Sequence, residues 1–111
     1  MSAFQTIAKV DEIPLGQGRC FEVDNRVIAV FNIDGQFTAI DDMCPHMGAS
    51  LCEGEYNPEN STVACPLHGW RFNVFDGTWA DNPRIKTDSF EVKIVGNEVQ
   101  VCSIPRKRDE G

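Results

Sequence analysis

Two short segments hold both histidines of the chain and two of its five cysteines. The first box, 44–48, reads Cys-Pro-His-Met-Gly, and the second box, 65–69, reads Cys-Pro-Leu-His-Gly. Thiolates and imidazoles are common protein ligands for transition metals. Zinc fingers usually place like ligands together in each half, whereas each box here carries one cysteine and one histidine. The candidate metal ligands are Cys44, His46, Cys65 and His68.

This mixed pattern resembles the Rieske family, in which two cysteines hold one iron of a 2Fe-2S cluster and two histidines hold the other. The resemblance runs through 44–51 and 65–72 to 76–77 and covers roughly residues 20–102. It implies one 2Fe-2S cluster, with Cys44 and Cys65 on the inner iron. His46 and His68 would bind the outer iron. A structural zinc site is the alternative use of the same ligands. The residues expected around the ligands are Pro45, Gly48, Pro66, Gly69, Trp70 and Phe72.

The rest of the chain alternates short apolar runs with turn residues, which is typical of an all-β protein. Turns are predicted at 24–25, 34–35, 76–77 and 96–97. The predicted strands are 20–23, 27–31, 36–40, 62–64, 72–75, 90–95 and 99–104. In the last hairpin, the side chains of Val92 and Ile94 should lie opposite Val99 and Val101. With the resemblance, this pattern predicts a Rieske-type antiparallel β-sandwich or barrel whose cluster-binding subdomain is formed by two loops.

A chain of 111 residues can form one domain with its own core. We expect a single Rieske domain at 1–105, cluster-binding loops at about 43–52 and 64–76, and a disordered tail at 106–111. Segment 53–61 contains a proline and two asparagines and is therefore interpreted as a surface connection. A single helical turn is predicted at 11–15.

The composition indicates where the protein acts. The longest apolar run is only 27–31, and residues 1–14 do not resemble a signal peptide, so we expect a cytoplasmic protein without a membrane partner. A formal net charge of −7 argues against a nucleic-acid partner. Four acidic residues flank the first box and form either a docking patch for a basic partner or ordinary solvated charge. They are Asp41, Asp42, Glu53 and Glu55.

Three cysteines lie outside the candidate ligand set. Cys20 and Cys102 fall in predicted strands, where a half-buried thiol is expected. Cys52 is expected to be a free thiol, because it is out of register with the loop disulfide of high-potential Rieske proteins. Ala49 and Leu67 occupy the two positions of that disulfide. A reducing compartment fits this cysteine usage.

The residues after the second box indicate the redox potential. High-potential Rieske proteins have a serine and a tyrosine at these positions, whose hydroxyls bond sulfur and favour the reduced state. This chain has Trp70 and Phe72 there, and neither offers a hydroxyl. The resemblance therefore implies a potential near the low end of the Rieske range, about −150 mV rather than about +300 mV.

The sequence indicates an electron carrier rather than an enzyme. An oxygenase needs a second iron held by further histidines, and the boxes use both histidines of the chain. The first hypothesis is a low-potential Rieske ferredoxin that passes single electrons from a flavin-dependent reductase to a terminal oxygenase. The alternative is the small subunit of a cytosolic NAD(P)H-dependent nitrite reductase, bound to the large subunit. A metal-stabilised, non-redox interaction module is the second alternative.

Overall fold

The computed structural model describes residues 4–42, 50–57, 59–66 and 69–106. Within these residues the chain is built from antiparallel strands, and helical structure is limited to the 3-10 turns η1 (Val10–Glu12) and η2 (Leu51–Glu53), which confirms the all-β prediction. The strands are β1 (Phe4–Lys9), β2 (Gly18–Val23), β3 (Arg26–Ile33), β4 (Gln36–Asp41), β5 (Glu55–Asn57), β6 (Thr62–Ala64), β7 (Arg71–Asn73), β8 (Thr78–Trp79), β9 (Asn82–Lys86), β10 (Ser89–Phe90), β11 (Val92–Val95) and β12 (Glu98–Cys102).

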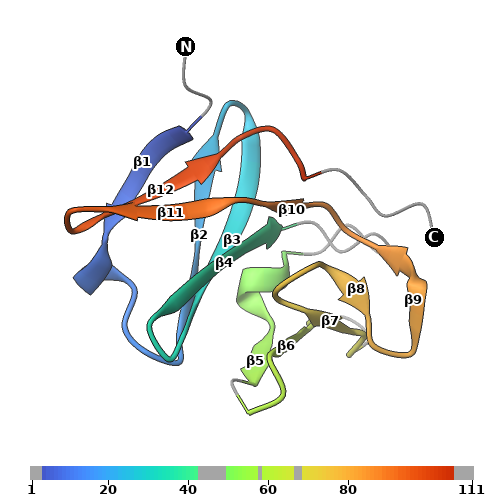
Figure 1. Cartoon of the computed structure of the whole chain (residues 1–111). Coiled ribbons are helices and arrows are strands. Elements are labelled where there is room, and N and C mark those ends of the chain that lie inside the picture. The colour runs from blue at the N-terminus through green and yellow to red at the C-terminus, as the bar shows by residue number, and fades with distance from the viewer. Residues whose placement is uncertain (1–3, 43–49, 58, 67–68, 107–111) are drawn as a thin grey trace.

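The strands form three sheets. The three-stranded sheet has the order β1-β12-β11, the four-stranded sheet β10-β4-β3-β2, and the five-stranded sheet β5-β6-β7-β8-β9. Figure 1 shows the five-stranded sheet at the lower right, below the other two. Both candidate ligand boxes border this third sheet in sequence, because the first precedes η2 and the second joins β6 to β7.

Strand β3 lies between two hydrophobic clusters. Its residues 28–33 are all buried, and successive side chains point to opposite faces of the sheet. Ile28 and Val30 pack in one cluster with Val99 and Val101 of the three-stranded sheet. The intervening residues pack in the other cluster, which is lined by the five-stranded sheet and includes Ala29, Phe31, Ile33, Ile40, Leu51, Val63, Cys65, Phe72 and Val74. The four-stranded sheet therefore separates the two hydrophobic clusters and contributes side chains to both.

The hairpins agree with the predicted turns. Asp24 and Asn25 both have positive φ, 51° and 64°, as a tight two-residue hairpin turn requires. In the last hairpin, Val92 lies opposite Val101 and Ile94 lies opposite Val99, which confirms the predicted register.

Several strands differ from the predicted ones. The strand predicted at 90–95 is divided at Glu91, whose carbonyl oxygen accepts a hydrogen bond from the amide of Cys102. The connection predicted at 53–61 contains β5, and β1, β8 and β9 were not predicted. These short strands carry weak apolar alternation of their own and form because a neighbouring strand offers its free edge. The turn predicted at 11–15 is η1 and begins one residue earlier.

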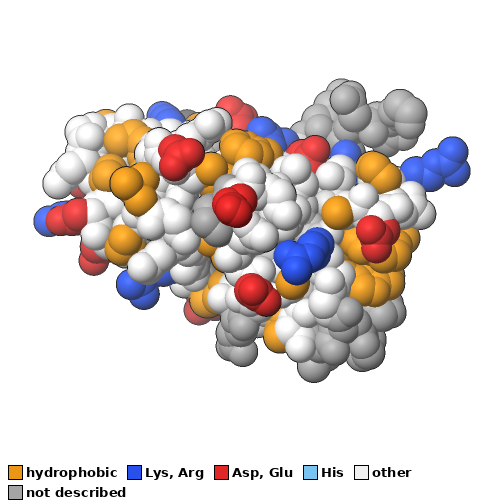
Figure 2. Space-filling model, turned by 90° about the horizontal axis from the view of Figure 1, so that it is seen from below, with side chains coloured by type: hydrophobic (Ala, Val, Ile, Leu, Met, Phe, Trp, Pro, Cys, Tyr) orange, Lys and Arg blue, Asp and Glu red, His pale blue; other side chains and the backbone are white. Residues whose placement is uncertain are grey.

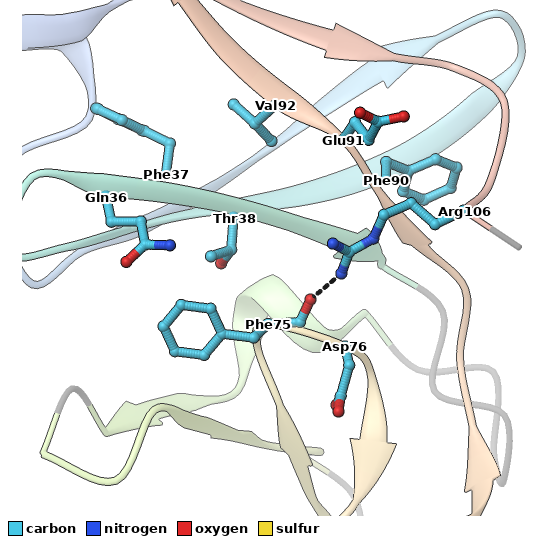
Figure 3. A pocket seen from close by; sticks show the side chains of 9 residues that line it. All are labelled: Gln36, Phe37, Thr38, Phe75, Asp76, Phe90, Glu91, Val92 and Arg106. Carbon is cyan, nitrogen blue, oxygen red and sulfur yellow. Dashed lines mark hydrogen bonds between the residues drawn. The ribbon is translucent and has the colours of Figure 1, made fainter. Parts of the chain in front are cut away.

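Arg106 links the end of the chain to the five-stranded sheet. We expected residue 106 to begin a disordered tail, but its guanidinium donates a hydrogen bond to the Ser89 hydroxyl. It also donates one to the Phe75 carbonyl oxygen (Figure 3). These contacts cross a cavity of about 480 Å³ between β4, β10 and the turn after β7.

Candidate metal centre

Cys65 is the member of the candidate ligand set whose structure is described. It follows β6 directly, and its side chain is 2% exposed. Its amide donates a 2.7 Å hydrogen bond to the Trp70 carbonyl oxygen, and its own carbonyl accepts a 2.9 Å bond from Gly69. Gly69 has φ of 73°, a left-handed conformation that glycine adopts without steric cost. These two bonds join the described ends of the second box.

The other candidate ligands, Cys44, His46 and His68, lie outside the described residues, as do Pro45 and Gly48. Pro66 and Gly69 are exposed. The chain therefore passes from the buried Cys65 to the exposed Pro66 within one residue.

Asp42 closes the base of the first box. Its side chain is 6% exposed, and one carboxylate oxygen accepts a 2.8 Å hydrogen bond from the Cys52 amide. The other oxygen accepts a 2.5 Å bond from the Ser50 hydroxyl, and the main-chain carbonyl accepts a 2.6 Å bond from Leu51. Three bonds to one residue thus hold together the two ends of segment 43–49, which contains two of the predicted ligands.

The bases of the two boxes are neighbours. Leu51 of η2 and Cys65 are fully or nearly fully buried in the same hydrophobic cluster. Gly54, which ends η2, lies so close to Ala64 of β6 that a Cβ atom would overlap the Ala64 carbonyl oxygen. Since the two boxes start from adjacent points and one presents a buried thiol, the described residues fit a thiolate-ligated cluster held between two loops.

Two tryptophans stack beside this core. The Trp70 and Trp79 rings are 3.7 Å apart at their centroids and inclined by 5°. Phe72 is fully buried, lies opposite Trp79 in the sheet, and shares the hydrophobic cluster of Cys65. Of the two aromatic residues predicted near the 2Fe-2S cluster, Phe72 therefore lies in the hydrophobic cluster that contains Cys65, and Trp70 packs against that cluster.

We expect Phe72→Tyr to raise the reduction potential by some tens of millivolts. The new hydroxyl enters the buried cluster that contains Cys65, where a hydrogen bond to sulfur favours the reduced, more negative state. A net gain of about 1 kcal/mol corresponds to about 40 mV for one electron. Voltammetry measures the shift, with Phe37→Tyr as the control, because Phe37 packs against the other hydrophobic cluster. If both variants keep the wild-type potential, hydroxyl bonding does not set the potential here.

The acidic residues around the first box are mostly engaged within the molecule. Asp41 forms a 3.3 Å ion pair with Arg26, and Asp42 is buried, so these two do not form the docking patch considered above. Glu55 is exposed, while the side chain of Glu53 is not among those described. On the face that Figure 2 shows, acidic and basic side chains are interspersed rather than gathered by sign.

The remaining cysteines differ in exposure. Cys102 is half-buried as predicted, whereas Cys20 is exposed, because β2 is the edge strand of its sheet. Cys52 is half-buried in η2. Burial, and then the neighbouring Cys20 thiol, raise the pKa of Cys52 to about 12, so this thiol is protonated at neutral pH.

Within the described residues, no helix has the length and apolar character that crossing a membrane requires.

Comparison with known proteins identifies the family. Residues 3–103 match the family model of the Rieske [2Fe-2S] domain. The ferredoxin component of an alkene monooxygenase system from Xanthobacter autotrophicus is 28% identical over 103 residues, which cover 93% of this chain and 84% of that protein. The ferredoxin subunit of biphenyl dioxygenase from Pseudomonas sp. strain KKS102 is 34% identical over 99 residues, which cover 88% of this chain and 90% of that protein.

Solved structures of ferredoxins support the same family assignment. The ferredoxin of carbazole 1,9a-dioxygenase from Nocardioides aromaticivorans IC177 superposes with a TM-score of 0.84 at 27% identity, over 91% of this chain and 98% of that one. A chain from a complex of reduced oxygenase and oxidized ferredoxin in carbazole 1,9a-dioxygenase superposes with a TM-score of 0.86 at 29% identity. The match covers 97% of this chain and 100% of that one. These matches confirm the predictions of a Rieske-type fold and of one Rieske-type 2Fe-2S cluster. The chain therefore belongs to the Rieske 2Fe-2S family.

Proposed function

We propose that this protein is a Rieske ferredoxin that passes single electrons from a flavin-dependent reductase to a terminal oxygenase. The observation that carries the proposal is the match, over 97% of this chain, to a structure that contains a ferredoxin together with its oxygenase. The two curated relatives reported above are likewise ferredoxin components of oxygenase systems. All four proteins favour this hypothesis over the small subunit of nitrite reductase and over a non-redox interaction module.

In this proposal the four residues of the boxes hold the cluster. Cys44 and Cys65 bind one iron, and His46 and His68 bind the other. The bound cluster supplies reversible one-electron chemistry. The protein needs no substrate pocket for this role, and the two relatives are ferredoxin components, which are carriers rather than enzymes.

The described residues support the carrier role in two ways. Cys65 is shielded by Leu51, Phe72 and the rest of its apolar cluster, so its sulfur is kept from water. Pro66 and Gly69 of the second box are exposed, so a partner protein can contact the chain at these two residues. Burial on one side and access on the other allow electron transfer across a docked interface without exposing the thiolate.

The low potential is part of the same proposal. The apolar surroundings of Cys65 disfavour added negative charge, because a reduced cluster in apolar surroundings gains little solvation. Trp70 and Phe72 offer no hydroxyl to sulfur. Both effects favour a low potential, which suits a reductase-to-oxygenase carrier better than a respiratory complex.

Reconstitution tests the function. The holo protein is combined with a flavin-dependent reductase and a terminal oxygenase from the same organism, and NAD(P)H consumption and aromatic product are measured. We expect product only when all three proteins are present, and no turnover by the isolated chain. The Cys65→Ser variant replaces the ferredoxin as a control and should give no product. Substrate turnover by the isolated chain, or product formation without it, would contradict the proposal.

A further inference from the structure

Three side chains that could bind a metal, none of them in the predicted cluster ligand set, meet at the base of the first box. They are Cys20, Asp42 and Cys52, and one ligand atom from each lies within 4.8 Å of the other two. Cys20 belongs to β2, Asp42 follows β4, and Cys52 belongs to η2, so the fold brings them together. We propose that these residues form a second metal site, for one thiophilic divalent cation such as Zn²⁺.

The alternation of the four-stranded sheet directs Cys20 to this place. Cys20 lies opposite Ala29 in the β2–β3 register, and paired residues of antiparallel strands point to the same face. Ala29 packs in the cluster that contains Leu51 of η2. Cys20 therefore lies on the face of the sheet that η2 covers, at the open edge, where an ion can enter from solvent.

The distances suit a zinc ion. Zn²⁺ binds thiolate sulfur at about 2.3 Å and carboxylate oxygen at about 2.0 to 2.2 Å. Two ligands of one tetrahedral ion are then about 3.5 to 3.8 Å apart. The three ligand atoms are already within about 1 Å of this spacing, and the exposed Cys20 side chain can rotate to close the difference.

The carboxylate of Asp42 is already fixed in position before any metal binds. Its carboxylate is buried and fixed by the Cys52 amide at 2.8 Å and the Ser50 hydroxyl at 2.5 Å. Such hydrogen bonds orient a metal-binding carboxylate and limit its freedom. The Ser50 oxygen is also 3.6 Å from the Cys52 sulfur, so this hydroxyl or a water can take the fourth position.

The charge of the site favours a cation. In the metal-bound state, two thiolates and a carboxylate carry three negative charges at short range, and a divalent cation offsets two of them. Binding must release the protons of both the Cys20 and the Cys52 thiols, as is usual for thiolate ligands. The bound ion joins the edge of the four-stranded sheet to η2 and thereby stabilises the base of the first box. Because only the folded chain brings the three residues together, the ion stabilises the folded state.

The test uses chelator-treated holo protein titrated with zinc chloride. We expect one zinc per chain after gel filtration, with the iron content unchanged. At a zinc concentration about ten times the Kd, alkylation of Cys20 and Cys52 by iodoacetamide should slow about tenfold, as peptide mass spectrometry measures. Alkylation of Cys102 in the same sample should not change. Cys20→Ala, at an exposed position that folding does not depend on, should abolish zinc retention, and Cys102→Ala should keep it.

Three outcomes would overturn the site. The first is equal zinc retention by wild type and Cys20→Ala, which would place the ion elsewhere. The second is zinc uptake that rises as iron is lost, since the ion would then occupy the cluster ligands. The third is no zinc retention by the wild type. This outcome includes the case in which Cys20 and Cys52 have formed a disulfide, which makes both residues resist alkylation and lowers the mass of the protein by two hydrogens.

Discussion

Cys65→Ser is expected to remove the iron from the protein and to lower its thermal stability. The thiol is 2% exposed at the end of β6, where the short five-stranded sheet meets the rest of the core. Serine leaves a buried hydroxyl in an apolar cluster and removes a thiolate ligand. Metal binding contributes to folding in small metalloproteins, so losing the cluster also loses this stabilisation. A loss of about 2 kcal/mol in the free energy of unfolding lowers Tm by roughly 9 °C in a domain of this size.

Iron content and a melting curve measure the two effects together. Cys65→Ala, which offers no oxygen ligand, should give the same result, and Cys102→Ser serves as the control at a half-buried cysteine of β12. The control should keep full iron and a Tm close to that of the wild type. Full iron in Cys65→Ser and Cys65→Ala would show that the thiol is not a ligand.

Gly54→Ala is expected to destabilise the protein through a single added methyl group. The backbone of Gly54 has φ of −85°, which alanine adopts easily, so the cost is steric. The new Cβ would overlap the carbonyl oxygen of Ala64, and backbone cannot move aside as a flexible side chain can. Overpacking of this kind lowers the free energy of unfolding by about 1 to 3 kcal/mol or more. Because Ala64 directly precedes Cys65, we also expect lower iron occupancy.

Gly96→Asn is the matched control. Gly96 lies at the tip of the last hairpin with φ of 63°, and a Cβ there meets no atom within 4 Å. Asparagine tolerates this left-handed conformation, so the larger side chain should change Tm little. A Gly54→Ala protein that melts like the Gly96→Asn protein and retains its iron would mean that η2 and β6 are not in fixed contact.

Much of the fold could be predicted from local pattern. Strand β3 and the hairpins at 24–25 and 96–97 follow from apolar runs separated by residues that accept positive φ. The two boxes were recognised because their ligand types and spacing are specific. Strands β1, β5, β8 and β9 could not be recognised in this way, since their pairing depends on the edge that a distant neighbour offers.

The role of Asp42 could not be predicted either. Two adjacent aspartates in a sequence usually indicate surface charge. The side chain of Asp42 is nevertheless buried, and it accepts hydrogen bonds from Ser50 and Cys52 on the other side of the first box. Its proximity to Cys20 likewise depends on how η2 packs against β2. Both features depend on how separate elements pack together, which spacing alone does not encode.

The stacked indoles also give the protein a local optical signal. Trp70 and Trp79 are the two tryptophans of the chain, and both belong to the five-stranded sheet or its border. Tryptophan fluorescence therefore reports on that sheet alone, whereas far-ultraviolet circular dichroism averages over the whole backbone. Rings that are 3.7 Å apart and nearly parallel also couple their electronic transitions, so the near-ultraviolet dichroism should change as soon as the stack opens. Opening of the part of the molecule that carries Cys65 can thus be followed separately from the unfolding of the other two sheets.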